Sequence, residues 1–257
     1  MKPAPISVQL YSVRAQINER GLPALLKTIA DIGYAGVEFA GYKGLAPAEL
    51  RKILDDLGLR ASSTHGALPT SKNLKEIVED ARALGFTTHV CGPGFGNKVA
   101  SRDEVLRAAA ELQAGAELLR REGLRLAVHN HEYEFDRVFD GQTPHEILRD
   151  HAPDLLFELD TYWAAVGGHD PAKVLRQLGA RAPLLHIKDG PKQRAAAMTA
   201  VGRGAMEWAP VFAAADEKAL EWAIVELDAC ETDMVAAVAD SYAYLVSTGY
   251  AVGRRTA

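Results

Sequence analysis

Polar and apolar side chains alternate in several short segments of this chain, as they do in a strand with one apolar and one polar face. The segment LLHIKD (184–189) places His186 and Lys188 on the face opposite Leu185 and Ile187. The segment IVELD (224–228) places Glu226 in the same way. Carboxylate, imidazole and amine groups in this arrangement are suited to acid–base or metal chemistry if the strands converge.

Three earlier segments, at residues 36–39, 124–131 and 155–160, show the same alternation. Their polar faces carry Glu38, His129, His131, Glu158 and Asp160, and Glu134 follows just past the second segment. Two carboxylates about 4 Å apart repel by roughly 4 kcal/mol at an effective dielectric constant of about 20, so several converging carboxylates need a cation. Carboxylates with imidazole suit Mn²⁺, Mg²⁺ or a similar ion, and the lack of a thiolate disfavours a structural zinc site.

A repeated sequence pattern indicates which elements hold these residues. In each repeat a helical stretch is followed by a glycine and then by a short apolar run, and we call this junction a joint. The joint glycines are Gly33, Gly58, Gly85, Gly123 and Gly179. We expect each to end a helix in the left-handed conformation, which glycine adopts without steric cost. Helix starts are predicted at Ser101–Glu104, Thr143-Pro144 and Asp170-Pro171.

Eight candidate strands begin near residues 6, 36, 59, 87, 124, 155, 183 and 222. Spacings of roughly 23 to 39 residues are typical of repeated strand–helix units with a parallel sheet. No G-x-G-x-x-G turn follows the first strand at residues 7–11, which disfavours a dinucleotide-binding fold. No linker divides the chain, so we predict one α/β domain, a (β/α)₈ TIM barrel over residues 1–257. The polar strand ends would then share its C-terminal mouth.

Composition narrows the possible partners. The net charge is −5, which disfavours a nucleic-acid partner because backbone binding needs clustered Lys and Arg. No apolar signal region opens the chain, and no run of eighteen apolar residues indicates a membrane span. Cys91 and Cys230 lack metal-type spacing, so we expect buried free thiols and a cytoplasmic location.

The motifs GYAGVEFAG, HNHEYEF, LDTYWAAVGGHDP, HIKD and VELD resemble the xylose-isomerase-like superfamily, in its sugar phosphate isomerase/epimerase branch. The similarity runs from QLYSVR near residue 9 to the eighth strand. It implies a single metal ion held by residues of the fifth to eighth strands, which correspond here to Glu134, Asp160, His186 and Glu226. Because Glu134 lies beyond its strand, His129 and His131 remain alternatives. Mn²⁺ is the expected ion, with Mg²⁺, Co²⁺ and Zn²⁺ as alternatives.

The resemblance also implies substrate contacts. His65, in STHG (63–66), matches the family's substrate-binding histidine, with an ordinary turn histidine as the alternative. Lys188 would bind a substrate oxygen or polarise a carbonyl, unless it forms an ion pair. The other expected substrate contacts are Glu38, His129, His131, Glu158 and Trp163, with Glu158 also a candidate base or structural residue. Phe95 would be a pocket wall or ordinary packing. Gly202-Arg203-Gly204 has the form of a phosphate loop, but the lack of further basic residues disfavours that role.

The expected activity is a divalent-metal-dependent sugar isomerase or epimerase. A carboxylate, Glu226 or Glu134, would remove the proton beside a substrate carbonyl, and a second group would return it to the resulting enediolate. Loss of a β-oxygen substituent would instead give a lyase or dehydratase acting on a keto-sugar, keto-inositol or 3-keto-glycoside. The expected partner is a small sugar or polyol substrate. The sequence leaves open whether the chain forms a homo-oligomer.

Two rival functions follow from the same fold. An AP-endonuclease-like nuclease would need three zinc ions and a histidine three residues after the sixth-strand aspartate, where this chain has Trp163. A non-catalytic sugar-binding barrel would explain a pocket but not acid–base residues around a metal.

Overall fold

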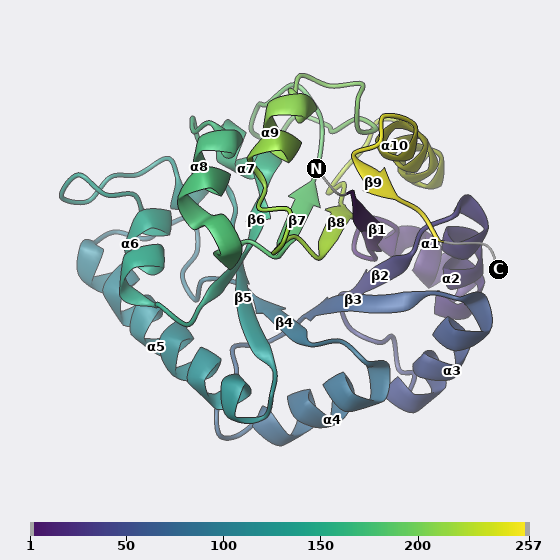
Figure 1. The fold of residues 1–257 in the computed structure, drawn as a ribbon, viewed down its shortest axis with the longest axis horizontal. Coiled ribbons are helices and arrows are strands. Elements are labelled where there is room, and N and C mark those ends of the chain that lie inside the picture. Colours follow the sequence, from purple (N-terminus) through teal and green to yellow (C-terminus); the bar gives the residue numbers. More distant parts are fainter. Residues whose placement is uncertain (1–2, 255–257) are drawn as a thin grey trace.

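Eight parallel strands form a closed barrel in the computed structural model, which describes residues 3–254 (Figure 1). The strands are β1 (Ala4–Gln9), β2 (Gly36–Phe39), β3 (Arg60–His65), β4 (Thr88–Cys91), β5 (Arg125–His129), β6 (Leu156–Asp160), β7 (Leu184–Ile187) and β8 (Trp222–Val225). The barrel closes because β1 pairs with both β2 and β8, with Ser7 opposite Gly36 and Ile224. The predicted (β/α)₈ fold is confirmed, and each strand begins within two residues of its predicted start.

The helices form a layer around the strands (Figure 1). They are α1 (Arg14–Arg20), α2 (Leu22–Ile32), α3 (Pro47–Leu57), α4 (Leu74–Leu84), α5 (Arg102–Arg121), α6 (Pro144–His151), α7 (Thr161–Val166), α8 (Pro171–Leu178), α9 (Trp208–Ala214) and α10 (Met234–Ser247), with 3₁₀ turns η1 (Glu132–Glu134) and η2 (Gly179–Arg181). The predicted starts of α5, α6 and α8 are confirmed, because Ser101, Thr143 and Asp170 each accept a backbone N–H of the first turn.

The joint glycines behave as predicted at four of five positions. Gly33, Gly58 and Gly85 end their helices in the left-handed conformation, with φ of 114°, 66° and 82°. Gly123 lies one residue beyond the cap of α5, also at positive φ. Gly179 differs: its φ of 53° and ψ of −127° lie outside the left-handed helical region, and it begins η2.

The barrel interior has two chemically different halves. An apolar cluster that includes Leu184, Trp222 and Ile224 fills the end at which the strands begin. Two residues further along β7 and the β8 chain, on the same face, stand His186 and Glu226, both buried. The strand alternation therefore places a layer of polar side chains at the C-terminal mouth, next to the apolar cluster that fills the other end of the barrel.

The rest of the chain adds little to the site. A two-residue strand that was not predicted, β9 (Ala251–Val252), pairs with β1 outside the barrel ladder. Both cysteines are free, and Cys91 is buried as expected, but Cys230 is partly exposed.

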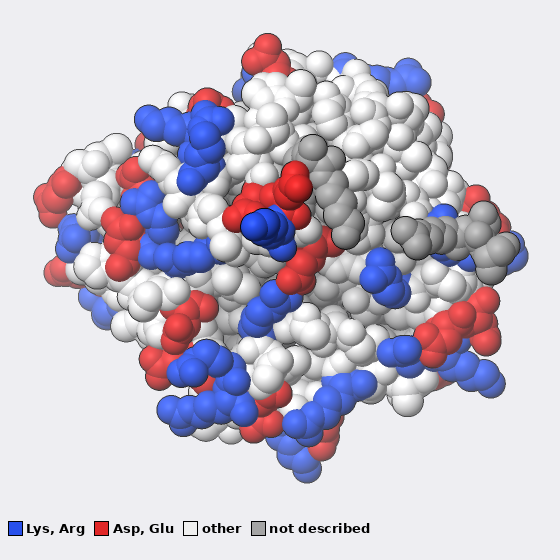
Figure 2. All heavy atoms as spheres, in the orientation of Figure 1, with Lys and Arg blue, Asp and Glu red and all other residues white. Residues whose placement is uncertain are grey.

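On the face that Figure 2 presents, acidic and basic side chains are interspersed. Within residues 3–254, no helix has the length and apolar character needed to cross a bilayer.

Candidate metal centre

Four side chains from consecutive strands converge in the barrel mouth: His129, Asp160, His186 and Glu226. One ligand atom from each lies within 4.8 Å of the others. His129 Nε2 is 3.3 Å from Asp160 Oδ2, and His186 Nδ1 is 2.9 Å from Glu226 Oε2. We call these four residues the mouth group. Three of the four positions for which the resemblance implied ligands are among them.

His129 and Glu226 are in the protonation states that a cation needs, whereas burial of His186 is outweighed by the neighbouring carboxylates, which raise its pKa well above its usual value, so that a cation would displace its proton. Burial lowers the pKa of His129 to about 3, so its imidazole is neutral and has a lone pair. Burial alone would raise the pKa of Glu226, but Lys188 and His186 outweigh it and hold that pKa well below its usual range. The His186 Nδ1 atom is buried and has no hydrogen-bond partner despite the nearby carboxylate. Four converging ligand atoms, one of them without a hydrogen-bond partner, fit a metal ligand set.

Lys188 is an ion-pair residue in this structure. Its ammonium Nζ lies 2.7 Å from Glu226 Oε2, 2.8 Å from Asp228 Oδ2 and 3.1 Å from Asp160 Oδ2. The side chain is almost fully buried, with 1% exposed. One ammonium therefore faces three carboxylates, which leaves the cluster with a deficit of positive charge that a divalent ion would balance.

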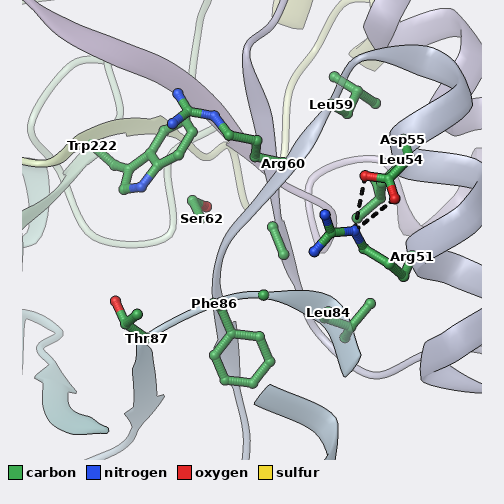
Figure 3. A pocket seen from close by; sticks show the side chains of 12 residues that line it. Arg51, Leu54, Asp55, Leu59, Arg60, Ser62, Leu84, Phe86, Thr87 and Trp222 are labelled. Atoms are coloured by element: carbon green, nitrogen blue, oxygen red, sulfur yellow. Dashed lines mark hydrogen bonds and ion pairs between the residues drawn. The ribbon is translucent and has the colours of Figure 1, made fainter. Parts of the chain in front are cut away.

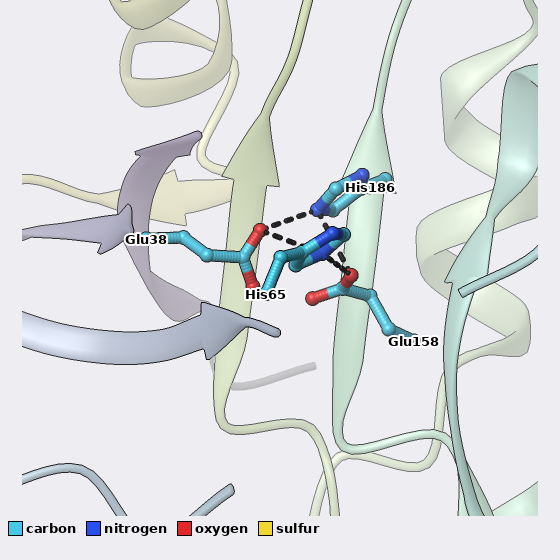
Figure 4. A group of neighbouring side chains, drawn as sticks. All are labelled: Glu38, His65, Glu158 and His186. Carbon is cyan, nitrogen blue, oxygen red and sulfur yellow. Dashed lines mark hydrogen bonds and ion pairs between the residues drawn. The ribbon is translucent and has the colours of Figure 1, made fainter. Parts of the chain in front are cut away.

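A second group of four residues shares His186 with the mouth group (Figure 4). His186 Nε2 is 2.8 Å from Glu38 Oε1 and 3.2 Å from Glu158 Oε2. His65 Nε2 is 2.6 Å from Glu158 Oε2 and 3.3 Å from Glu38 Oε1. We call Glu38, His65, Glu158 and His186 the inner group. Since Glu158 stands two residues before Asp160 on β6, it lies one layer deeper in the barrel.

A cavity of about 260 Å³ opens onto both groups. It is lined by Gln9, Tyr11, Ala40, His65, His129, His131, Lys188, Glu226 and Asp228. His65, His129 and His131 were predicted to contact substrate, and the structure places them here. Glu38, Glu158 and Trp163, predicted for the same role, are not among its lining residues. The two glutamates are fully buried, and the Trp163 ring lies behind the cavity wall, with its centre 5.6 Å from Lys188 Nζ. Gln9 and Asp228 were missed, although each follows the strand alternation that selected the others.

Glu134 does not join either group. It lies in η1, where its Oε2 accepts the backbone N–H of His131 at 2.9 Å, and its Oε1 is buried without a partner. Burial raises the pKa of this carboxyl group well above its usual value. The turn after β5 thus directs Glu134 at its own backbone, and His129, one of the alternatives that the sequence left open, occupies the fifth-strand position instead.

Two other candidates from the sequence, Phe95 and the Gly202–Gly204 loop, lie outside the mouth cavity and both groups. Phe95 packs in the main hydrophobic core. In the Gly202–Gly204 loop, the backbone N–H of Gly202 donates to the buried carboxylate of Asp189, as do the Met206 N–H and the Trp208 indole. The anion that this loop surrounds is therefore a side chain of the protein itself, and the structure does not support a phosphate site there.

Another cavity, of about 250 Å³, lies where β3 and β8 begin (Figure 3). Its charged groups are already partnered: Arg51 bonds to Asp55 at 2.8 Å, and the Arg60 guanidinium lies 4.5 Å from the centre of the Trp222 ring. Active sites of such barrels lie at the opposite end. Both candidate metal groups within residues 3–254 are at that opposite end.

The comparisons agree with this architecture. Residues 26–245 match the model of the xylose isomerase-like TIM barrel family, and the chain belongs to that family. No curated protein matches the chain in sequence.

Solved structures extend the likeness over the whole chain. A sugar phosphate isomerase/epimerase from Parabacteroides distasonis ATCC 8503 is 25% identical, with a TM-score of 0.80 over 98% of this chain and 96% of its own. The probable 3-DHS dehydratase AsbF from Bacillus anthracis is 13% identical, with a TM-score of 0.72 over 94% and 98%. The IOLI protein, solved with a zinc atom, is also 13% identical, with a TM-score of 0.75 over 95% and 98%. The last two show a shared fold.

Proposed function

We propose that this protein is a divalent-metal-dependent sugar isomerase or epimerase, with its metal held by His129, Asp160, His186 and Glu226. The observation that carries the proposal is the convergence of these four ligand atoms within 4.8 Å beside the mouth cavity. Similarity to a sugar phosphate isomerase/epimerase and the zinc atom in the IOLI structure support it. Two carboxylates and two imidazoles suit Mn²⁺, the ion we expect, and also accept Zn²⁺ or Co²⁺.

The protein's own groups divide the work. When bound, the ion would polarise a substrate carbonyl and so acidify the neighbouring C–H. Glu226 is the proposed base, because it is ionised and lines the cavity, whereas Glu134 is bonded within its own turn. A positioned base of this kind contributes about 10²–10⁴-fold to the rate. Cation binding would free Lys188 from Asp160 and Glu226, leaving its ammonium to contact a substrate oxygen from the cavity wall.

His65 is the proposed hydrogen-bond donor on the other wall. Burial alone would lower its pKa, but Glu38 and Glu158 outweigh that effect and raise it to about 10. The imidazole therefore carries two N–H groups in the metal-free protein, and 26% of the side chain is exposed. A donor on one wall and a carboxylate on another would orient a sugar with its C–H toward Glu226.

Solvent deuterium incorporation tests this proposal. The protein is incubated with Mn²⁺ in D₂O and a panel of ketoses, sugar phosphates and 3-keto-glycosides, and each compound is followed by NMR. Deuterium at the carbon beside the carbonyl, lost in the Glu226→Gln variant, is the expected result. Elimination of a β-substituent would instead identify the lyase alternative. Several compounds that bind the metal-loaded protein with neither outcome would favour the non-catalytic sugar-binding barrel.

A further inference from the structure

The inner group has the composition and spacing of a cation site in its own right. Each of its two imidazole Nε2 atoms faces both carboxylates, at distances from 2.6 to 3.3 Å. Ligand atoms around a tetrahedral ion at 2.0 to 2.2 Å would stand about 3.3 to 3.6 Å apart. Shifts of a few tenths of an ångström in each atom would therefore bring the four imidazole–carboxylate pairs to this spacing, and all four ligand atoms already lie within 4.8 Å of one another. The rings of His65 and His186 already lie parallel, 5° apart in plane.

Surrounding hydrogen bonds hold one carboxylate in place. Glu38 Oε1 accepts from the Gln9 amide at 2.6 Å, and Glu38 Oε2 accepts from the Ser63 hydroxyl at 2.5 Å. Outer partners of this kind orient ligands in metal sites. They leave the inward side of Glu38 directed at the two imidazoles (Figure 4).

The inner group also contains a buried carboxylate oxygen that no protein group satisfies. Glu38 and Glu158 are both fully buried, and their ion-pair contacts are with histidines alone. The Glu158 Oε1 atom is buried and has no hydrogen-bond partner. A divalent ion here would displace the protons of His65 and His186 and take their place as the positive partner of both carboxylates.

His186 links the inner group to the mouth group through its two nitrogens. Its Nε2 faces the inner carboxylates, and its Nδ1 faces Glu226. A neutral imidazole has one lone pair and one N–H, so it can bind an ion through only one of these atoms. An ion at Nδ1 leaves an Nε2–H that donates to Glu38, and an ion at Nε2 leaves the opposite tautomer.

We propose that Glu38, His65, Glu158 and His186 Nε2 form a second site for a Zn²⁺-like cation, occupied only when the mouth group is empty. The donor set is two imidazoles and two carboxylates, which tetrahedral Zn²⁺ and Co²⁺ accept. The ion enters past His65, the member of the group that lines the cavity. This site does not depend on the reaction proposed above, since it requires only the ligand atoms.

Cobalt and zinc binding to the metal-free full-length protein test the proposal without any substrate. Tetrahedral Co²⁺ has strong visible absorption, which reports coordination directly, and calorimetry with Zn²⁺ gives stoichiometry. We expect the wild type to bind one ion per chain. The Glu226→Gln variant, with the mouth group weakened, still binds one Co²⁺ with a tetrahedral spectrum.

Second changes in the Glu226→Gln background identify the ligands. Adding Glu158→Gln or His65→Gln is expected to weaken binding at least about 100-fold, because the binding free energy of a structural zinc site is shared among four ligands. Adding Glu134→Gln, a buried glutamate outside both groups, is the matched control and leaves the spectrum and affinity unchanged. Far-ultraviolet CD confirms folding, and His65→Gln, at a partly exposed position, gives a result even if Glu158→Gln does not fold.

Three results would overturn the proposal. If Glu226→Gln binds no ion, the inner group is not a site. The same follows if the double variants bind as tightly as Glu226→Gln alone. Two ions bound to one wild-type chain would refute the mutual exclusion through His186.

Discussion

Replacing His129 with alanine should weaken zinc binding at the mouth group far more than replacing Glu134 with glutamine. His129 offers a neutral Nε2 atom 3.3 Å from Asp160 Oδ2, whereas Glu134 Oε2 accepts the His131 N–H in η1. Four-ligand zinc sites bind with about 10–16 kcal/mol, or about 2.5–4 kcal/mol per ligand. Loss of one ligand therefore raises the Kd by about 10²–10³-fold.

The Glu134→Gln change should act on stability instead. Glutamine keeps an acceptor for the His131 N–H, but its new amide group takes the place of a buried oxygen that has no partner. An unsatisfied buried donor costs about 1–3 kcal/mol. The Kd for zinc should change by less than about threefold, because Glu134 lies outside the ligand group.

Zinc calorimetry on both variants in a Glu158→Gln background makes the comparison clean, since that change removes the inner group as an alternative site. Urea unfolding measures stability in parallel. If Glu134→Gln lowers zinc affinity more than His129→Ala does, the ligand set implied by the family resemblance is correct and the set proposed from the structure is wrong.

Three further outcomes are expected. Lys188→Met should destabilise the metal-free protein by about 3–5 kcal/mol, because it leaves buried carboxylates unpaired. In thermal unfolding, zinc should restore most of the lost stability. An equal loss of stability with and without zinc would contradict this reasoning. Burial lowers the pKa of His145 to about 3, so the unfolded state takes up its proton first as the pH falls below about 6.5. Wild type should therefore lose about 2 kcal/mol more than His145→Phe between pH 7 and pH 5 in urea titrations, and parallel pH profiles would refute this. Asp189→Ala should lower the free energy of unfolding by at least about 3 kcal/mol, since several buried donors, including the Trp208 indole, lose their acceptor. A melting temperature equal to that of the wild type would show that water replaces the carboxylate as the acceptor.

The amino-acid sequence by itself determined the barrel and the direction of its inward side chains. Both depend on local rules: glycine is favoured where a helix ends at positive φ, and strand side chains alternate with a period of two. Glu226 between Val225 and Leu227 could therefore be placed on the polar face without knowledge of any distant residue. His186 beside Leu185 follows the same rule.

Tertiary structure alone decided how those side chains pair. Glu38 and His186 are 148 residues apart in the chain yet 2.8 Å apart in space, a contact that depends on barrel closure. The choice of His129 over Glu134 depends on the turn after β5, which no strand periodicity describes. The division of the polar residues into two groups that share one imidazole depends on strand register, which pairs Asp160 with His186 and Glu158 with Leu184. Register is set by packing among all eight strands, so it could not be deduced from any one of them.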